Sequence, residues 1–296
     1  GCSMLAILAI FSVLAEPRLP VRVEAGTLPN LIRVTDHVYS GGLPDGPAGF
    51  DELRRLGIKT LISVDSAMPD SLSAEKAGLR YVHLPHGYDG VPADRAHEIA
   101  RGLRDLPGPI YIHCHHGKHR SPAATAVACV EAGLIDKYQA KTLLRVAGTG
   151  KNYRGLHAAV DLAQPVDRQT IDLADPSFPP VADIPPLAKR MVDMDHLLEQ
   201  LAILQKGGFP KSTEPAHDPS HLALLLREEY VETARLDEPA RRPPAFRDLL
   251  TAGEEQARLL EEDLEAGRPE EASKRLILLK QNCTACHEQF RDNAHP

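Results

Sequence analysis

The chain has 296 residues, about twice the usual size of one domain, so its length predicts two domains. Hydrophobic residues make up 43% and charged residues 25% of the composition, which excludes a disordered chain, a collagen-like fibre and a polytopic membrane protein. The net charge of -7 excludes a broadly basic surface, so we expect no nucleic-acid partner, although a local anion pocket is compatible with it.

The N-terminal segment predicts export. An apolar run from Met4 to Ala15 is shorter than the roughly 20 residues of a membrane-spanning helix. It is typical of the core of a secretory signal, with Glu16 and Pro17 beginning the mature chain. A retained anchor, with Cys2 as a lipid attachment point, and a buried strand are the alternatives. We expect residues 1–15 to be a signal or anchor segment.

Short β-rich runs alternate with helical stretches between residues 27 and 163. Because strands that alternate with helices form a mostly parallel sheet with helices packed on it, this region predicts an α/β domain. Runs of β-branched and aromatic residues mark the strands, and glycine or proline marks several helix ends. The expected strands are 31–34, 37–40, 60–64, 81–84 and a run ending at Cys114, and the expected helices are 47–56, 92–106, 121–132, 137–146 and 153–162.

A proline-rich stretch separates this region from the rest of the chain. Residues 164–186 carry six prolines and no sustained periodicity, which predicts a stiff linker. Four amphipathic stretches follow with short connections, so residues 187–296 predict an all-α antiparallel four-helix bundle. The expected helices are 187–205, 218–235, 244–265 and 269–291.

The string HCHHGKHRS, residues 113–121, combines a nucleophile with an anion-binding turn. It follows an apolar strand and ends where Pro122 begins a helix, so loop amides and the positive helix end converge on one side. Gly117 permits the turn of the backbone, and the positive field favours the thiolate of Cys114. Arg120 can hold two phosphate oxygens with its planar guanidinium. The pattern predicts phosphoryl transfer to sulfur; the alternatives are a buried structural cysteine and a metal-binding histidine cluster.

This string resembles the signature of the cysteine-dependent protein tyrosine phosphatases, which is HC, five residues, then R and S or T. The resemblance is closest to the compact dual-specificity branch, and the segments RVTDHVYSGGLP and FDELRRLGIKTLISVDS extend it over roughly residues 31–163. It implies that Cys114 is the nucleophile, Arg120 the phosphate clamp, His113 a support for the thiolate and Ser121 the hydroxyl that assists release of the cysteine. Lys118 is similar to members that act on inositol phosphates or phosphoinositides. The expected phosphate-binding residues are His115, His116, Gly117, Lys118, His119 and Arg120.

A phosphatase of this kind also needs an acid that protonates the leaving group. The family supplies an aspartate from a loop upstream of the cysteine, and the segment HGYDGVPAD lies in that position. Asp89 is the expected general acid and Asp94 the second choice. Asp89 with Gly90 is also an ordinary turn signal, and Asp94 can simply cap a helix. Cys129 lies among alanine and valine and is expected in the core.

A second motif, CTACH, lies near the end of the last predicted helix. Cys283 and Cys286 are one helical turn apart with His287 next to them, so two thioether links and an axial nitrogen can come from one face. A zinc half-site is the alternative, but it needs a second pair of ligands that the nearby sequence lacks. The motif predicts one covalently bound haem c per chain.

The segment CTACHEQFR resembles the C-terminus of the cytochrome c prime family, including its low-spin c-556 branch, and the similarity spans about residues 187–293. Arg291 matches a basic residue of the family motif. In the first helix of the family an arginine is followed four residues later by the side chain over the distal haem face, and Arg190 and Met194 fit this pattern. Met194 is the expected sixth iron ligand beside His287, with Met191 second and His196 third. Packing of both methionines in a hydrophobic core is the alternative.

Together these patterns predict an exported, periplasmic bacterial fusion of a dual-specificity-like phosphatase and a haem-binding bundle. The expected activity is hydrolysis of phosphomonoesters through a cysteinyl-phosphate intermediate, with the haem serving electron transfer or redox and gas sensing. The expected partners are a phosphorylated substrate, a redox partner or diatomic ligand, a membrane where the N-terminal segment anchors the chain, and a second copy in a dimer. The alternative is a haem electron carrier whose first domain only binds phosphate or docks a partner.

Overall fold

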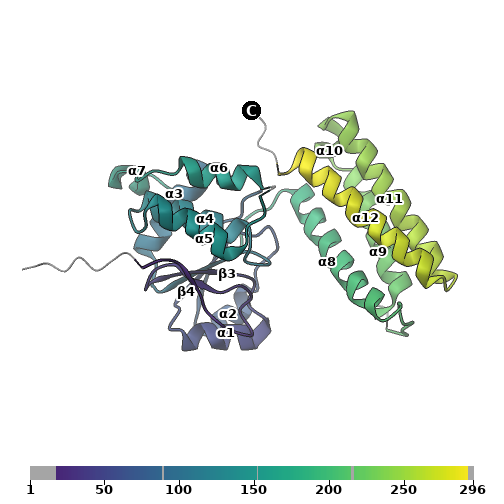
Figure 1. Cartoon of the computed structure of the whole chain (residues 1–296), viewed down its shortest axis with the longest axis horizontal. Helices are drawn as coiled ribbons and strands as arrows, with labels where there is room; N and C mark the ends of the chain where they lie inside the picture. The colour runs from purple at the N-terminus through teal and green to yellow at the C-terminus, as the bar shows by residue number, and fades with distance from the viewer. Residues whose placement is uncertain (1–17, 89, 152, 215–216, 293–296) are drawn as a thin grey trace, which may run out of the picture.

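The computed structural model describes residues 18–292 except 89, 152 and 215–216, and it folds into two lobes (Figure 1). The expected signal segment, residues 1–15, lies outside the described residues. The first lobe contains a six-stranded sheet in the order β1-β2-β3-β6-β4-β5. The second lobe is helical. Among the described residues no helix is both long and apolar enough to cross a membrane.

The sheet of the first domain is parallel over its centre and antiparallel at one edge. Strands β3, β6, β4 and β5 pair in parallel, whereas β1 and β2 form an antiparallel extension next to β3. The expected strands are found, each shifted or shortened by a few residues at its ends. The strands are β1 (Val21–Arg22), β2 (Ile32–Arg33), β3 (Val38–Gly41), β4 (Thr60–Ser63), β5 (Arg80–His83) and β6 (Ile110–His113).

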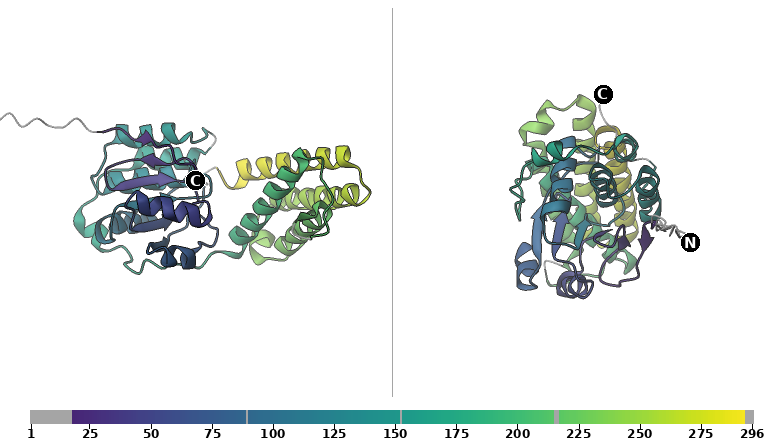
Figure 2. Two further views of the ribbon diagram at one scale, coloured as in Figure 1. Left: turned by 90° about the horizontal axis from the view of Figure 1, so that it is seen from below. Right: turned by 90° about the vertical axis from the view of Figure 1, so that its left-hand side faces the viewer.

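Helices cover both faces of this sheet, as Figure 2 shows, because alternate strand residues are apolar on each face. One face packs on α1 (Gly46–Arg55) and α2 (Ser71–Lys76), and their shared core includes Leu53, Leu61 and Tyr111. The other face packs on α3 (Ala93–Asp105), α4 (Arg120–Glu131), α5 (Lys137–Ala147) and α6 (Arg154–Leu162). Helix α4 is buried along its whole length, with Cys129 in the core as expected.

The proline-rich stretch differs from the expected linker in its first two thirds. It contains a short helix, α7 (Arg168–Asp172), and the side chains of Ile171 and Phe178 join the core of the first domain. Backbone bonds add to this, since the His83 N–H donates to the carbonyl of Pro179. The sequence does not reveal this packing, because the spaced prolines break the periodicity by which a packed segment is normally recognised. The first domain therefore extends beyond residue 163.

The described residues of the second domain form four long helices and one short one. Helix α8 packs on α9, α9 on α11 and α11 on α12, whereas α8 and α12 share far fewer contacts. Proline lies in the first turn of each long helix, where its missing N–H costs no hydrogen bond. The helices enclose one core around Leu201, Leu226, Leu260 and Leu276. They are α8 (Pro186–Lys206), α9 (Pro219–Ala234), α10 (Asp237–Arg241), α11 (Pro244–Glu265) and α12 (Pro269–Phe290).

Candidate functional site

The loop between β6 and α4 carries the first site, at the carboxyl edge of the parallel strands. Cys114 directly follows β6 and is 4% exposed. Gly117 has φ +69, and an added Cβ there would lie 2.4 Å from the Gly41 carbonyl carbon and the Gly42 nitrogen. The end of β3 thus approaches the loop so closely that only glycine fits at position 117.

The backbone amides of this loop are available for an anion. Within the described chain, the N–H groups of residues 115–119 donate to no protein acceptor. The carbonyls are held instead: the Leu43 N–H donates to His115 O, and the Asn30 side chain donates to Gly117 O. With its carbonyls held by neighbouring segments and the N-terminus of α4 adjacent, the loop is a preformed anion cradle.

Ser121 lies beside the thiol of Cys114. Its Oγ is 3.3 Å from Cys114 Sγ and donates to the Gly41 carbonyl at 2.9 Å. A hydroxyl has one proton, so in this arrangement the thiol is the donor to Ser121 Oγ. The Cys114 sulfur and the Ser121 hydroxyl are therefore within hydrogen-bonding distance of each other.

His113 is fully buried below the loop as a neutral ring. Burial lowers the pKa of His113 to about 4, despite the opposing field of Asp65. Tyr81 Oη lies 2.6 Å from His113 Nε2, and burial raises the pKa of Tyr81 well above its ordinary value, so the phenol donates. His113 Nδ1–H is left to donate to the Cys114 carbonyl at 3.4 Å. This chain of bonds orients the residue that carries the nucleophile.

Arg120 is buried and only partly satisfied. Its Nη2 donates to Asp65 Oδ2 at 2.9 Å, but its Nε has no hydrogen-bond partner among the described residues. Burial alone would raise the pKa of Asp65, but Arg120 and the Ala67 N–H outweigh burial and hold this pKa below its usual range. A buried guanidinium donor without a partner is costly unless a ligand fills the place. Arg120 is thus fixed by Asp65 and keeps a donor free for an oxyanion.

Two tyrosines and a residue from the second domain border the site. The Arg120 guanidinium lies 4.4 Å from the ring centre of Tyr88, and the Arg291 guanidinium lies 4.0 Å from the same centre. Tyr153 stacks on His119 with ring centres 4.0 Å apart. We call residues 114–119, between β6 and α4, the phosphate loop, after its proposed ligand. The end of α12, which carries the CTACH motif, therefore reaches the rim of this loop.

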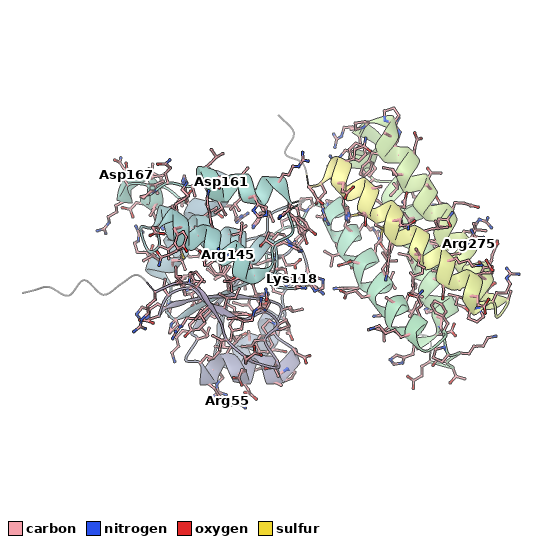
Figure 3. The ribbon with its side chains drawn as sticks, viewed as in Figure 1. Arg55, Lys118, Arg145, Asp161, Asp167 and Arg275 are labelled. Carbon is pink, nitrogen blue, oxygen red and sulfur yellow. The ribbon has the colours of Figure 1, made fainter. Side chains whose placement is uncertain are left out.

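The remaining expected residues have mixed outcomes. Asp89 lies outside the described residues, and Asp94 is exposed in the first turn of α3. His116 and His119 are two of the expected phosphate-binding residues. Burial, followed by neighbouring histidines, lowers the pKa of both rings, that of His119 to about 4, so they favour the neutral form. Lys118 is exposed on the side of the first domain that faces α8 (Figure 3).

Sequence reasoning missed Asp65, Tyr81 and Tyr88. A usable signal existed for Asp65, because it follows an apolar parallel strand, and ligand-binding groups gather at the carboxyl ends of such strands. Tyr81 belongs to an expected strand, but nothing in its spacing shows that its hydroxyl reaches His113. Contacts of this kind depend on strand order, which the sequence alone does not reveal.

The second motif lies where α12 meets α9 and α8. Cys283 and Cys286 are free thiols, and Tyr230 Oη lies 3.5 Å from Cys283 Sγ. Burial, followed by Arg291, lowers the pKa of His287 to about 3, so the imidazole is neutral. Met194 is 4% exposed and joins the core cluster against which Cys283 packs.

The three candidates for a sixth ligand differ in position. Met194 and Met191 both contact the helical core, whereas His196 is exposed and its ring lies 5.8 Å from that of His115 in the first domain. Arg190 forms an ion pair with Glu229 of α9 at 2.9 Å. The geometry therefore places the methionines, and not His196, on the same side as Cys283.

Comparisons with known proteins were made by sequence and by structure, and no family model matches the chain. Mouse protein tyrosine phosphatase type IVA 2 is 31% identical over 96 residues, which is 30% of this chain and 56% of the mouse protein. Dual specificity protein phosphatase TpbA of Pseudomonas aeruginosa (strain UCBPP-PA14) is 29% identical over 139 residues, or 46% of this chain and 63% of TpbA. The chain thus spans little more than half the length of these curated relatives.

Among solved structures, that of P. aeruginosa TpbA is similar with a TM-score of 0.44 and 24% identity, covering 53% of this chain and 96% of that chain. A TpbA structure in complex with pTyr has a TM-score of 0.43 and 25% identity, covering 50% of this chain and 92% of that chain. The sequence relatives support a dual-specificity-like phosphatase domain in this chain.

Proposed function

We propose that the first domain hydrolyses phosphomonoesters through a cysteinyl-phosphate intermediate. The observation that carries this proposal is the buried Arg120, whose Nε has no hydrogen-bond partner among the described residues. Arg120 follows a loop whose amides donate to no acceptor within those residues and whose cysteine sulfur contacts Ser121. A nucleophile, an anion cradle and a fixed guanidinium in one loop are the parts that phosphoryl transfer to sulfur needs.

In the first step the Cys114 thiolate attacks phosphorus and the bond to the ester oxygen breaks. The loop amides and Arg120 stabilise the equatorial oxygens, and Asp65 holds the guanidinium in place. The departing oxygen takes a proton from an acid, for which we propose Asp89. Cys114 then carries the phosphoryl group as a thiophosphate ester.

In the second step water attacks phosphorus, the same aspartate accepts its proton, and the sulfur–phosphorus bond breaks. Ser121 assists here because its hydroxyl is within reach of both Gly41 O and Cys114 Sγ. Rotation of the hydroxyl from the carbonyl to the sulfur supplies a hydrogen bond to the leaving thiolate. Inorganic phosphate is released and the thiolate is restored.

The substrate class that we propose is a phosphotyrosine, phosphoserine or phosphothreonine residue, or an inositol-type phosphate. Exposed Lys118 and the nearby Arg291 add cations at the rim, and these suit a substrate with a second anionic group. Profiling of the purified chain against phosphopeptides, phosphoinositides and inositol phosphates would rank these classes.

Hydrolysis of p-nitrophenyl phosphate tests the activity. The full chain should turn the ester over, Cys114→Ser should not, and Cys129→Ala should keep the activity because Cys129 is buried in the core near the far end of α4. Equal turnover by the parent and Cys114→Ser would overturn the proposal. Phosphate binding without turnover in the parent would favour a binding module.

We also propose that the helical domain is a bundle of the cytochrome c prime type that binds one haem c covalently. The residues fit such a group: two free thiols one helical turn apart precede a neutral imidazole, and a buried methionine lies in the core beside them. The sparse contact between α8 and α12 agrees with a group that would be held between these helices. Cys283 and Cys286 would form the thioether links, and His287 and Met194 would bind the iron.

A bound haem would supply electron transfer or binding of a diatomic ligand. Its attachment would require export from the cytoplasm, which agrees with the apolar segment at residues 4–15, and we propose a periplasmic location with a redox partner or a diatomic gas as the further partner. In a host that matures c-type cytochromes, haem should remain bound after denaturation and be lost in the double variant Cys283→Ala, Cys286→Ala. A high-spin ferrous spectrum in the parent would overturn ligation by Met194.

An electron carrier whose first domain merely docks a partner is the second candidate function, supported by the CTACH motif.

Contact of Arg291 with Tyr88 provides a physical route by which the two domains affect each other. Phosphatase turnover that is equal with ferric, ferrous and NO-bound haem would show that the two domains act independently.

A further inference from the structure

The phosphate loop points two histidine side chains toward the second domain. His115 and His116 both approach Glu199 on α8, and their rings meet edge to face with centres 4.3 Å apart. His115 Nε2 lies 3.3 Å and His116 Nε2 lies 3.7 Å from the same carboxylate oxygen, Glu199 Oε1. Two imidazoles thus share one carboxylate across the two domains.

These nitrogen-to-oxygen distances are longer than those of good hydrogen bonds, in which the donor and acceptor atoms lie about 2.7 to 3.2 Å apart. They match the separation of neighbouring ligands around a small tetrahedral cation. With metal–ligand bonds of about 2.0 to 2.1 Å at tetrahedral angles, two ligand atoms lie about 3.4 Å apart. The three donor atoms all lie within 4.8 Å of one another.

We propose that His115, His116 and Glu199 bind a divalent transition-metal cation of the Zn²⁺ class. Two imidazoles and one carboxylate are a donor set that zinc accepts, with a fourth place left for water or for the neighbouring His196 ring, 5.8 Å from that of His115. The site is separate from the CTACH motif, which lies on α12, and no residue of that motif takes part.

The ion would also act as a clamp between the domains. Its two imidazoles belong to the loop that follows Cys114, and its carboxylate belongs to α8. A bound cation therefore ties the loop to the helical domain and adds positive charge beside the phosphate cradle. Since the metal binds only when the two domains are together, it stabilises that arrangement by mass action.

Zinc binding to the full chain tests the site. The affinity is measured by competition with a chromophoric zinc indicator. All proteins in this measurement carry Cys114→Ser, so that the loop thiolate is absent. Glu199→Gln and His116→Ala should each weaken the Glu199-dependent site by about tenfold or more. Glu265→Gln, an exposed carboxylate of α11, is the matched control and should bind as the parent does. Co²⁺ should give weak visible bands in the parent, and Glu199→Gln should lose them without any change in thiolate-to-cobalt charge transfer.

Hydrogen exchange provides a second readout that a simple ion pair would not produce. Zn²⁺ should slow exchange in the loop 114–119 and in α8 around residue 199 together, in the parent and not in Glu199→Gln. With a chelator present, Glu199→Gln should hydrolyse p-nitrophenyl phosphate as the parent does. Equal zinc affinity and equal protection in the parent, Glu199→Gln and His116→Ala would overturn the proposal.

Discussion

The two motifs of this chain differ in how many segments of the chain contribute to them. The cysteine loop of the first domain depends on residues from several distant segments, with Asp65 holding Arg120, Tyr81 bonded to His113, and the end of β3 packed on Gly117. The CTACH motif lies within a single helix, and its three residues share one side of α12 by helical spacing alone. The first site is therefore sensitive to changes far away in the sequence, whereas the second is specified by local structure.

The largest effect on activity is expected from substitution of Gly117, for which Gly133 is a matched control. Both have φ +69, but an added Cβ meets the Gly41 and Gly42 backbone at 2.4 Å only at position 117 and meets nothing within 4 Å at position 133. Gly117→Ala should displace the loop and lower kcat/KM by about 100-fold or more, because misplacement of a catalytic group by about 1 Å has that effect.

Gly133→Ala should cost about 1 kcal/mol of stability and leave turnover intact. Steady-state kinetics and chemical denaturation of both variants measure the contrast. Equal turnover of the two variants would contradict the close approach of β3 to the loop.

Asp65→Asn tests whether a residue outside the loop supports the site. It leaves Arg120 buried without its carboxylate, which should cost about 3 kcal/mol of unfolding free energy and lower kcat/KM by about tenfold. Inorganic phosphate should restore part of the stability, because it offers the guanidinium another anion.

The exposed pair Arg18–Asp36, at 3.0 Å, is the control for Asp65. Asp36→Asn should change stability by less than about 0.5 kcal/mol, since exposed ion pairs contribute little. Denaturation with and without phosphate separates the two pairs, and the same phosphate response in both variants would exclude the proposed role of Asp65.

At the opposite end of α4 from the phosphate loop, Glu131 should make stability depend on pH. Burial raises the pKa of Glu131 to about 7, and its Oε2 has no hydrogen-bond partner among the described residues. Because the native carboxyl holds its proton to a higher pH than the unfolded one, stability should fall as pH rises from about 4.5 to about 7 and stay level above that.

Glu131→Gln should remove this component and gain about 1 to 2 kcal/mol above pH 7, after allowance for solvent screening. Glu75→Gln, in an exposed position of α2, should follow the parent's pH profile. Thermal unfolding from pH 4.5 to 8 is the measurement, and parallel profiles for all three proteins would refute the assignment.

The smallest expected effect joins the two regions. Arg291→Ala removes the guanidinium that lies over Tyr88, a contact typical of about 0.5 to 2 kcal/mol, so phosphatase kcat/KM should change only a few-fold. Arg275→Ala, on the same helix and paired with Asp263 inside the helical domain, should leave turnover unchanged. If Arg291→Ala and Arg275→Ala alter turnover equally, the end of α12 has no special contact with the site.

Much of the fold could be predicted because its signals are periodic. Alternating apolar strands, proline at helix starts and glycine at helix ends located most of the helices and the central strands. Short elements were missed: β1, α2, α7 and α10 span too few residues for a period to emerge. The proline-rich stretch was partly misjudged because Ile171 and Phe178 reach the core without any pattern around them.

By itself, the sequence determined the residues of both motifs and the chemistry that we expect of them, since Cys114, Arg120 and Ser121 in one string and CTACH in another are defined by residue type and spacing. Only the tertiary structure decided what surrounds them: the carboxylate that holds Arg120, the phenol on His113, the contact of Arg291 with Tyr88 and the position of Glu199 beside two histidines. The physical reason is that local spacing orients side chains within one turn, whereas strand order and the packing of helices bring together residues that are far apart in the chain.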